Sequence, residues 1–196
     1  VDVWYHVGSA YEAEGKTGFA HLFEHMMFQG TPNVAKREHS ELVQRAGGNN
    51  NGSTTQDRTN YYQTLPSNRL NLGLWLEADR MQSLAVTSEN FENQRDVVKE
   101  ERRQRIDNQP YSNAFLASDT MSYDFVPYRH TVIGRMVDLD AGTVEDAQAF
   151  YKRYYTPNNA VLVVVGDIDP KSTMKMVEEY FGDIPRGPDV EPIGGV

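Results

Sequence analysis

The chain has 196 residues, of which 39% are hydrophobic, and its formal net charge is −9. This length allows one large domain or two small ones, and the acidic balance argues against a nucleic-acid-binding protein. There is no cysteine, which excludes disulfides, cysteine-based zinc sites and a thiol nucleophile, and which leaves the cellular compartment open. The longest apolar run, residues 160–165, is far too short to cross a bilayer.

The first quarter of the chain predicts a strand, a buried helix and an amphipathic helix. Apolar residues alternate with polar ones over residues 1–7, which is the period of a strand. Residues 17–30 contain no proline, and Thr17 and Gly30 are suited to the start and the end of a helix. Residues 35–46 have an amphipathic pattern, and His39 lies there among charged residues, where we expect it to be solvated.

Residues 49–66 are β-prone and largely polar, which predicts a hairpin or two paired strands around Asp57-Arg58. The first arm, residues 51–56, has polar side chains on both faces, so it has little to bury and is typical of a sheet edge. Its free backbone groups could pair with an extended peptide. A plain solvated hairpin explains the same residues equally well.

The rest of the chain predicts five helices, one strand and a tail. Ser67, Ser88 and Thr143 are placed to cap the first, second and fourth of these helices. Residues 159–166 form an apolar run bounded by asparagine and glycine, which predicts a fully buried central strand. The tail, residues 184–196, is rich in proline and glycine and is predicted to be a linker. The five helices are predicted over residues 67–85, 89–107, 112–121, 144–155 and 170–181.

The most informative motif is His21-Leu22-Phe23-Glu24-His25. On a helix the two histidines stack on one face, so their imidazoles can bind one metal ion. Glu24 leans to the same side, where it can reach a water molecule on that metal without being a ligand. The neighbouring residues are apolar, and burying these polar groups without partners would cost on the order of several kcal/mol. The alternative is a pair of ordinary core or surface histidines.

A third ligand is expected on the helix predicted over residues 89–107. With Val97 placed at 0° and Val98 at about 100°, Glu101 falls near 40° and Glu100 near 300° at about 100° per residue. Glu101 therefore points into the protein, and Glu100 is expected to be a solvated charge. Gln94 falls near 60°, also inward, at about 100° per residue. A lone inward Glu101 is costly unless it meets a cation, which the histidine helix can supply.

Together these residues resemble the pitrilysin family of zinc peptidases, the inverzincins, whose pattern is His-x-x-Glu-His followed by a distant glutamate ligand. Here 75 residues separate His25 from Glu101. Further matches are Gly-Phe-Ala-His-Leu-Phe-Glu-His-Met-Met-Phe-Gln-Gly, the Gly-Gly before Asn51, and Val-Val-Gly-Asp at residues 164–167. The resemblance covers essentially the whole chain, and it is closest to bacterial two-domain members.

The resemblance implies an α+β fold with a mixed, largely antiparallel sheet and helices mainly on one face. It implies one zinc ion per chain, bound by His21, His25 and Glu101, with Glu24 as the general base. Gln94 would stand beside the ligands where family members often carry a glutamate, so this chain departs from the pattern there. The cellular compartment would be the bacterial periplasm or cytoplasm.

The resemblance also implies a substrate strand and a domain division. An extended peptide substrate would pair with the backbone of Asn51, Gly52, Ser53 and Thr54, where Gly52 replaces a common alanine. Residues 1–183 would form the zinc-binding metallopeptidase domain, without its first residues. Residues 184–196 would lead to a second homologous domain, in cis or as a separate subunit.

The implied function is a zinc-dependent endopeptidase that hydrolyses unfolded peptides or small polypeptides. On its own, this chain is expected to be weakly active or inactive, because the second domain encloses the substrate in the resembled family. One alternative is a non-catalytic subunit of the same family that binds peptides or serves assembly. The other is a metal hydrolase that acts on a non-peptide substrate.

Overall fold

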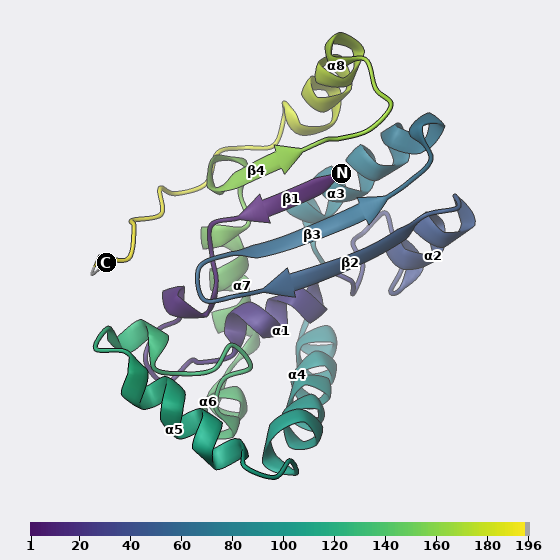
Figure 1. Ribbon diagram of the computed structural model, residues 1–196. Helices are drawn as coiled ribbons and strands as arrows, with labels where there is room; N and C mark the ends of the chain where they lie inside the picture. Colours follow the sequence, from purple (N-terminus) through teal and green to yellow (C-terminus); the bar gives the residue numbers. More distant parts are fainter. Residues whose placement is uncertain (195–196) are drawn as a thin grey trace.

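The computed structural model describes residues 1–194 and has one antiparallel sheet of four strands packed on helices (Figure 1). The strand order is β2-β3-β1-β4, and every pair of neighbours is antiparallel. The α+β fold predicted from the sequence is therefore confirmed. The strands are β1 (Asp2–Tyr5), β2 (Asn49–Thr54), β3 (Thr59–Thr64) and β4 (Ala160–Val163). The helices are α1 (Phe19–Met26), α2 (Glu38–Arg45), α3 (Leu70–Ser83), α4 (Ser88–Arg102), α5 (Ser112–Ser122), α6 (Met136–Ala141), α7 (Val144–Tyr154) and α8 (Pro170–Phe181).

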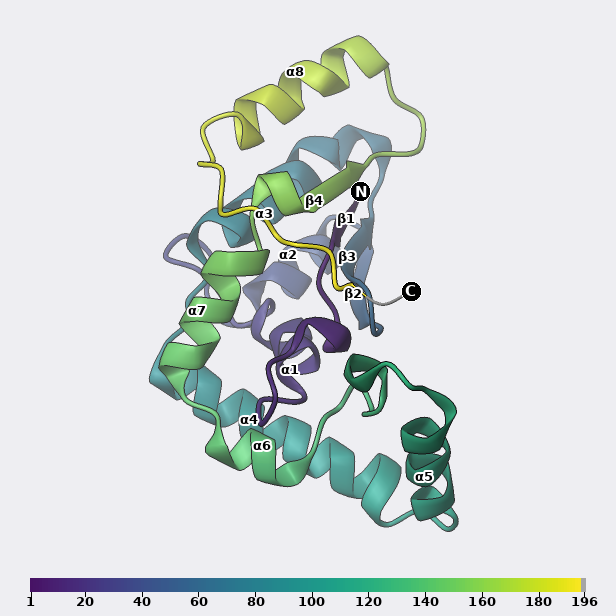
Figure 2. The same cartoon turned by 90° about the vertical axis from the view of Figure 1, so that its left-hand side faces the viewer.

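Helix α1 lies at the centre of the molecule, between the sheet and helices α4 and α7 (Figures 1 and 2). Its residues Leu22, Phe23 and Met26 are completely buried. They join a core that includes Val3 and several aromatic residues of the strands and α7, among them Tyr61. The apolar composition of residues 17–30 thus correctly predicted a buried helix. The complete burial of these three side chains holds α1 firmly against its neighbours.

Strand β2 is an edge of the sheet, as its polar sequence predicted. Strand β3 continues from it through a tight connection, and the pairing runs from Asn49 opposite Thr64 to Thr54 opposite Thr59. One face of the sheet packs on the helices. The other face is open, and it carries Trp4 of β1 and Val161 of β4.

The prediction of a fully buried central strand at residues 159–166 was wrong. Strand β4 is four residues long and forms the opposite edge of the sheet from β2. Its side chains alternate in burial, and Val161 is 62% exposed. An apolar run shows only that both faces could be buried. Within the described residues, nothing covers the open face, so both valines of β4 stay exposed.

Three predicted helix starts need correction. Thr17 does not cap α1; its side chain is buried, and α1 begins after Gly18. Ser67 begins a short 3-10 turn before α3 and makes no capping hydrogen bond. Helix α4 is capped by Thr87 rather than by Ser88, because the Thr87 hydroxyl accepts a hydrogen bond from the N–H of Asn90, the third residue of the helix. Thr143 does cap α7, as predicted, in a capping box.

His39 was predicted to be solvated and is instead 5% exposed. Its ring lies edge-on to Phe28, and the charged residues of α2 lie on the helix's other faces. Burial, reinforced by the nearby Arg80, lowers the pKa of His39 to about 2, so the ring is neutral. It takes no part in the candidate site.

The described part of the tail, residues 184–194, contains no helix or strand, and residues 195–196 lie outside the described residues. Among the residues the structure describes, no helix is both long enough and apolar enough to span a membrane.

Candidate metal centre

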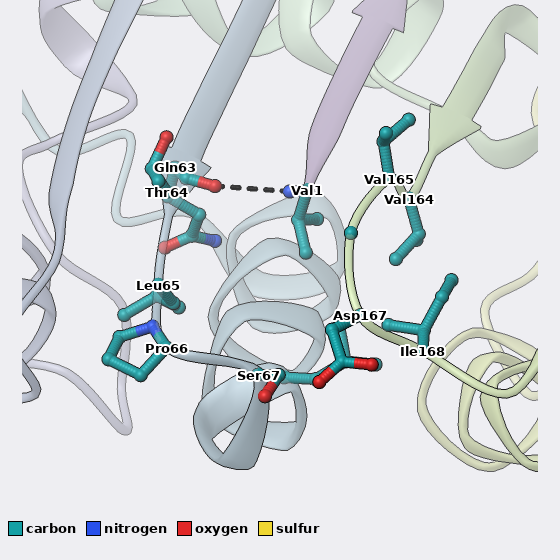
Figure 3. Close-up of a pocket in the computed structure, with 12 residues that line it drawn as sticks. Val1, Gln63, Thr64, Leu65, Pro66, Ser67, Val164, Val165, Asp167 and Ile168 are labelled. Atoms are coloured by element: carbon teal, nitrogen blue, oxygen red, sulfur yellow. Dashed lines mark hydrogen bonds between the residues drawn. The ribbon is translucent and has the colours of Figure 1, made fainter.

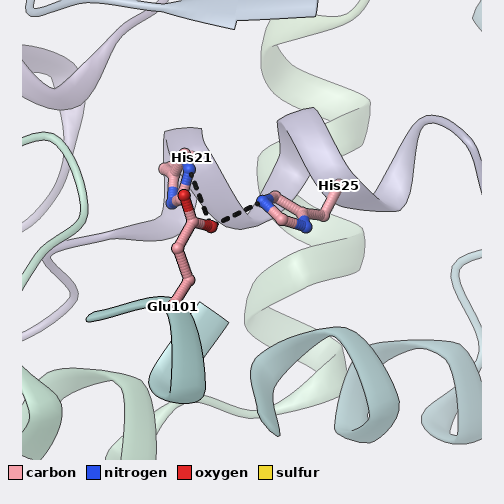
Figure 4. A group of neighbouring side chains, drawn as sticks. All are labelled: His21, His25 and Glu101. Carbon is pink, nitrogen blue, oxygen red and sulfur yellow. Dashed lines mark ion pairs between the residues drawn. The ribbon is translucent and has the colours of Figure 1, made fainter. Parts of the chain in front are cut away.

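Helices α1 and α4 bring His21, His25 and Glu101 together (Figure 4). The Nε2 atoms of His21 and His25 lie 3.6 Å and 3.2 Å from the Oε2 atom of Glu101. One ligand atom from each of the three residues lies within 4.8 Å of the other two. Within residues 1–194, this is the one group of three or more His, Asp or Glu side chains close enough to share a metal ion.

The dimensions and chemistry of this group fit a zinc ion. Nitrogen and oxygen ligands of a tetrahedral zinc lie about 2.0–2.2 Å from it, and so roughly 3.3 Å from one another. The histidine–glutamate distances in this group span that value. Burial, together with the neighbouring His25, lowers the pKa of His21 to about 4, so its imidazole is neutral at pH 7. Neutral imidazoles and a carboxylate are the donors that zinc accepts when cysteine is absent.

The choice of Glu101 over Glu100 agrees with where the structure puts the two side chains. The Glu100 carboxylate is exposed and pairs with Arg103, away from the histidines. Val97 was predicted to face inward and is instead 42% exposed. The inward face of α4 instead runs through Gln94, Val98 and Glu101, which are spaced four and three residues apart.

Gln94 is buried on that face, two turns before Glu101. Its amide Nε2 donates to Asn93 at 2.8 Å. None of the hydrogen bonds found in the described residues joins Gln94 to His21, His25 or Glu101. Arg105 makes the contact that the sequence did not predict: its guanidinium lies 2.8 Å from Oε1 of Glu101 and leaves Oε2 to the histidines.

Glu24 stands beside this group and touches strand β2. Its Oε2 atom accepts a hydrogen bond of 2.6 Å from the Thr54 hydroxyl. A cavity of about 450 Å³ is lined by His21, Glu24 and Glu101 together with Ser53 and Thr54. Arg105, Ile106 and residues 131–133 complete its walls. The candidate base, two of the three candidate ligands and the end of the edge strand therefore line one cavity.

The backbone of β2 has a fixed pattern of free groups. The Thr55 amide donates to the Arg58 carbonyl at 2.9 Å, which marks the first hydrogen-bonded pair of the hairpin. Hydrogen-bonded and non-hydrogen-bonded pairs alternate along an antiparallel ladder. Ser53 therefore directs its N–H and C=O groups to β3. Gly52 and Thr54 direct theirs toward the free edge.

The side chains of the four predicted substrate-binding residues divide between the two faces of the sheet. Thr54 faces the helices and meets Glu24, and a Cβ added to Gly52 would lie 3.2 Å from the Glu24 Cγ atom. The Ser53 hydroxyl donates to Asn60 on the open face. The Asn51 side-chain oxygen accepts a hydrogen bond of 2.9 Å from the Gly52 N–H. This outward N–H group of β2 therefore already has a partner in the same chain.

A second cavity, of about 290 Å³, lies at the other end of the sheet (Figure 3). Its walls come from the end of β3, from the start of α3 and from residues 164–168. Asp167 is the one acidic or basic side chain in its lining. This second cavity is remote from the candidate metal ligands. Thr64 in its wall pairs with Asn49, at the end of β2 opposite to Thr54.

Two buried carboxylates hold the segment that leads into α1, and the sequence did not predict either. The oxygens of Glu12 accept hydrogen bonds from the N–H groups of Gly18 and Ala20, each at 2.8 Å. Asp138 accepts from the N–H and the hydroxyl of Thr17. Sequence patterns for helix caps involve only residues within a few positions of the helix end. Glu12 lies seven residues before the first residue of α1, outside that range.

Comparison with known proteins places these features in a family. Residues 1–134 match the sequence model described as insulinase, peptidase family M16, and residues 142–195 match the one described as the peptidase M16 inactive domain. The chain is 38% identical over 181 residues to a protein of Helicobacter pylori named zinc protease PqqE, and this match covers 92% of the chain and 41% of that protein. The chain spans less than half of the curated relatives it matches.

The fold is similar to that of solved structures. A protease from Helicobacter pylori superposes with a TM-score of 0.92 at 36% identity, over 99% of this chain and 46% of that one. The first half of the periplasmic protease PqqL from Escherichia coli superposes with a TM-score of 0.84 at 24% identity, over 97% of this chain and 42% of that one. With a family model matched over two thirds of its length, the chain belongs to the insulinase family of peptidases, peptidase family M16.

Proposed function

We propose that this chain is the metal-binding part of a zinc-dependent endopeptidase that cleaves unfolded peptides or small polypeptides. His21, His25 and Glu101 bind one zinc ion, and Glu24 is the general base. The observation that carries this proposal is the convergence of three donor atoms beside a cavity that is also lined by a separate carboxylate, Glu24. Family membership supports it, since all four residues lie within the part matched to the insulinase model.

A zinc ion bound there would supply a Lewis acid that polarises the scissile carbonyl group and lowers the pKa of a water molecule. Glu24 accepts the proton of the attacking water and delivers it to the leaving amine. The Thr54 hydroxyl donates to Oε2 of Glu24, which fixes the carboxylate and leaves its Oε1 atom for the proton. Because Thr54 belongs to β2, this hydrogen bond joins the base to the edge strand.

The edge of β2 binds the substrate as an added strand over residues 51–54. Gly52 and Thr54 supply the outward backbone groups, and the Asn51 side chain must release the Gly52 N–H when a peptide binds. A folded substrate has no free strand to offer, so the substrate must be unfolded around the cleaved bond. Backbone pairing of this kind is tolerant of the substrate's side chains.

We place the zinc-binding domain at residues 1–183 and a linker to a second homologous domain at 184–196, with that domain in cis or in a separate subunit. The proposal is supported by the share of the Helicobacter pylori protease chain that this chain covers, 46%. The cavity is open on its own, and bulk water weakens electrostatic stabilisation of a transition state. The isolated chain should therefore turn over peptide much more slowly than the complete protein.

Two observations favour a second candidate, a non-catalytic subunit that binds peptide. Residues 142–195 match a model described as an inactive domain, and Gln94 is an amide where relatives in the resembled family often carry a carboxylate. The test is cleavage of an unstructured peptide by the complete protein, with and without a chelator. We expect chelator-sensitive cleavage. Peptide binding without cleavage, in protein shown to contain zinc, would favour the non-catalytic subunit.

A further inference from the structure

Glu12 is a buried carboxylate that caps α1 from outside the helix. Its side chain is fully buried, and its two oxygens divide between the N–H groups of Gly18 and Ala20. The residue in the cap position, Gly18, has a left-handed backbone with φ of 96° and offers no side chain to accept these hydrogen bonds. Glu12 thus satisfies donors that a helix start leaves free.

The first turn of α1 depends on this cap more than most helix starts do. Helix α1 has only eight residues, and a helix of this length has little stability of its own. His21 is the third residue of the helix, so it lies in the turn that Glu12 holds. If that turn frays, His21 moves while His25, near the other end, stays.

Glu12 also lies beside the segment that forms one wall of the cavity. Its Oε2 atom lies 3.8 Å from Nδ1 of His130, the residue just before the 131–133 wall. The backbone at Gly18 packs directly on that wall, since a Cβ added there would come within 2.6 Å of the Ile133 carbonyl oxygen. Asp138 holds the neighbouring Thr17 in the same junction. The start of α1 and the cavity wall therefore meet around Glu12.

We propose that Glu12 is a positioning residue for the metal centre: by holding the first turn of α1 against residues 130–134, it sets His21 at the separation from His25 and Glu101 that one zinc ion needs. This inference rests on the proposed metal binding. A zinc site tolerates only about 0.2 Å of error in its ligand distances. Supports beyond the ligands are worth about tenfold or more in metal affinity.

A cap could also serve stability alone, so the experiment needs a matched control. Asp169 caps α8, where its carboxylate accepts from the Ser172 N–H at 2.9 Å. Helix α8 lies well away from α1 and α4 (Figure 2). Asp169→Ala removes a helix cap without touching the metal centre. Glu12→Gln keeps the size of the side chain, but its amide can accept from only one of the two N–H groups.

Zinc affinity is measured for the full-length wild type, Glu12→Gln and Asp169→Ala by competition with a chromophoric chelator. Unfolding midpoints of the metal-free proteins are recorded in parallel. We expect a Kd for zinc raised about tenfold in Glu12→Gln and unchanged in Asp169→Ala. We also expect faster hydrogen exchange at Gly18 and Ala20 in Glu12→Gln, measured without metal.

An unchanged zinc Kd in a folded Glu12→Gln protein would overturn the inference, and so would a loss of affinity that Asp169→Ala shares. If Glu12→Gln does not fold, Glu12→Asp is measured instead. It keeps the carboxyl group but is one methylene shorter, and an affinity equal to wild type would then count against the positioning role. A wild-type protein that binds no zinc refutes the proposed function itself and is seen before any variant is compared.

Discussion

Glu101→Gln should weaken zinc binding by roughly a hundredfold to a thousandfold. The Glu101 carboxylate turns Oε2 to both histidines, and it is the one anionic donor among the three. Sites with four protein ligands bind zinc with a free energy of roughly 10–16 kcal/mol, which is about 2.5–4 kcal/mol for each ligand. At about 1.4 kcal/mol for each factor of ten, losing one ligand gives that range.

The fold should survive this substitution. The substitution removes the ion pair between Glu101 and Arg105. Because the Arg105 side chain is 76% exposed, this loss lowers the stability of the fold by at most about 1 kcal/mol. Glu100→Gln is the matched control one residue away, because that exposed carboxylate pairs with Arg103 and Gln104 rather than with the histidines. The assay is a chelator-competition titration with zinc, with metal-free unfolding midpoints as the check on folding. If Glu100→Gln loses the metal, or if Glu101→Gln retains it at wild-type affinity, the assignment of the third ligand is wrong.

Three further predictions follow from the same cavity and core. Glu24→Gln should keep zinc at wild-type affinity and lower kcat by about 10²–10⁴-fold, because it removes the proton acceptor; near wild-type turnover in the complete protein would refute the assignment. Gly52→Pro should raise KM for an extended peptide by removing an outward N–H, while Gly52→Ala, which adds the same Cβ, should not; equal KM values would argue against strand addition. Because the pKa of His39 is lowered to about 2 in the fold, stability is full above its unfolded pKa of about 6.5 and falls below it, by about 2 kcal/mol at pH 5. His39→Gln should remove this part of the acid sensitivity in metal-free protein, and an unchanged pH dependence of unfolding would show that another group causes it.

The sequence predicted those parts of the site that depend on local spacing. His21, Glu24 and His25 lie within one helix, so the helical period alone places them on one side. Glu101 could be chosen because the apolar residues of α4 define an inward face, even though Val97 was placed on it wrongly. The edge position of β2 also followed from composition, since a strand with polar residues on both faces has no core to enter.

The sequence did not predict features that arise between distant segments. Glu12 caps α1 only because an intervening turn folds back, and no pattern of neighbouring residues shows that return. His39 was misjudged because charged neighbours in sequence lie on other faces of α2. The exposure of β4 depends on what covers the sheet, which the apolar character of residues 159–166 cannot reveal.

The most direct test of the account is the zinc content and zinc coordination of the purified wild-type protein. The account predicts one zinc ion per chain, with an X-ray absorption spectrum that shows only nitrogen and oxygen ligands at about 2.0–2.2 Å. Protein equilibrated with zinc that retains none after dialysis, or zinc that stays bound when His21 and His25 are both replaced by alanine, would contradict it.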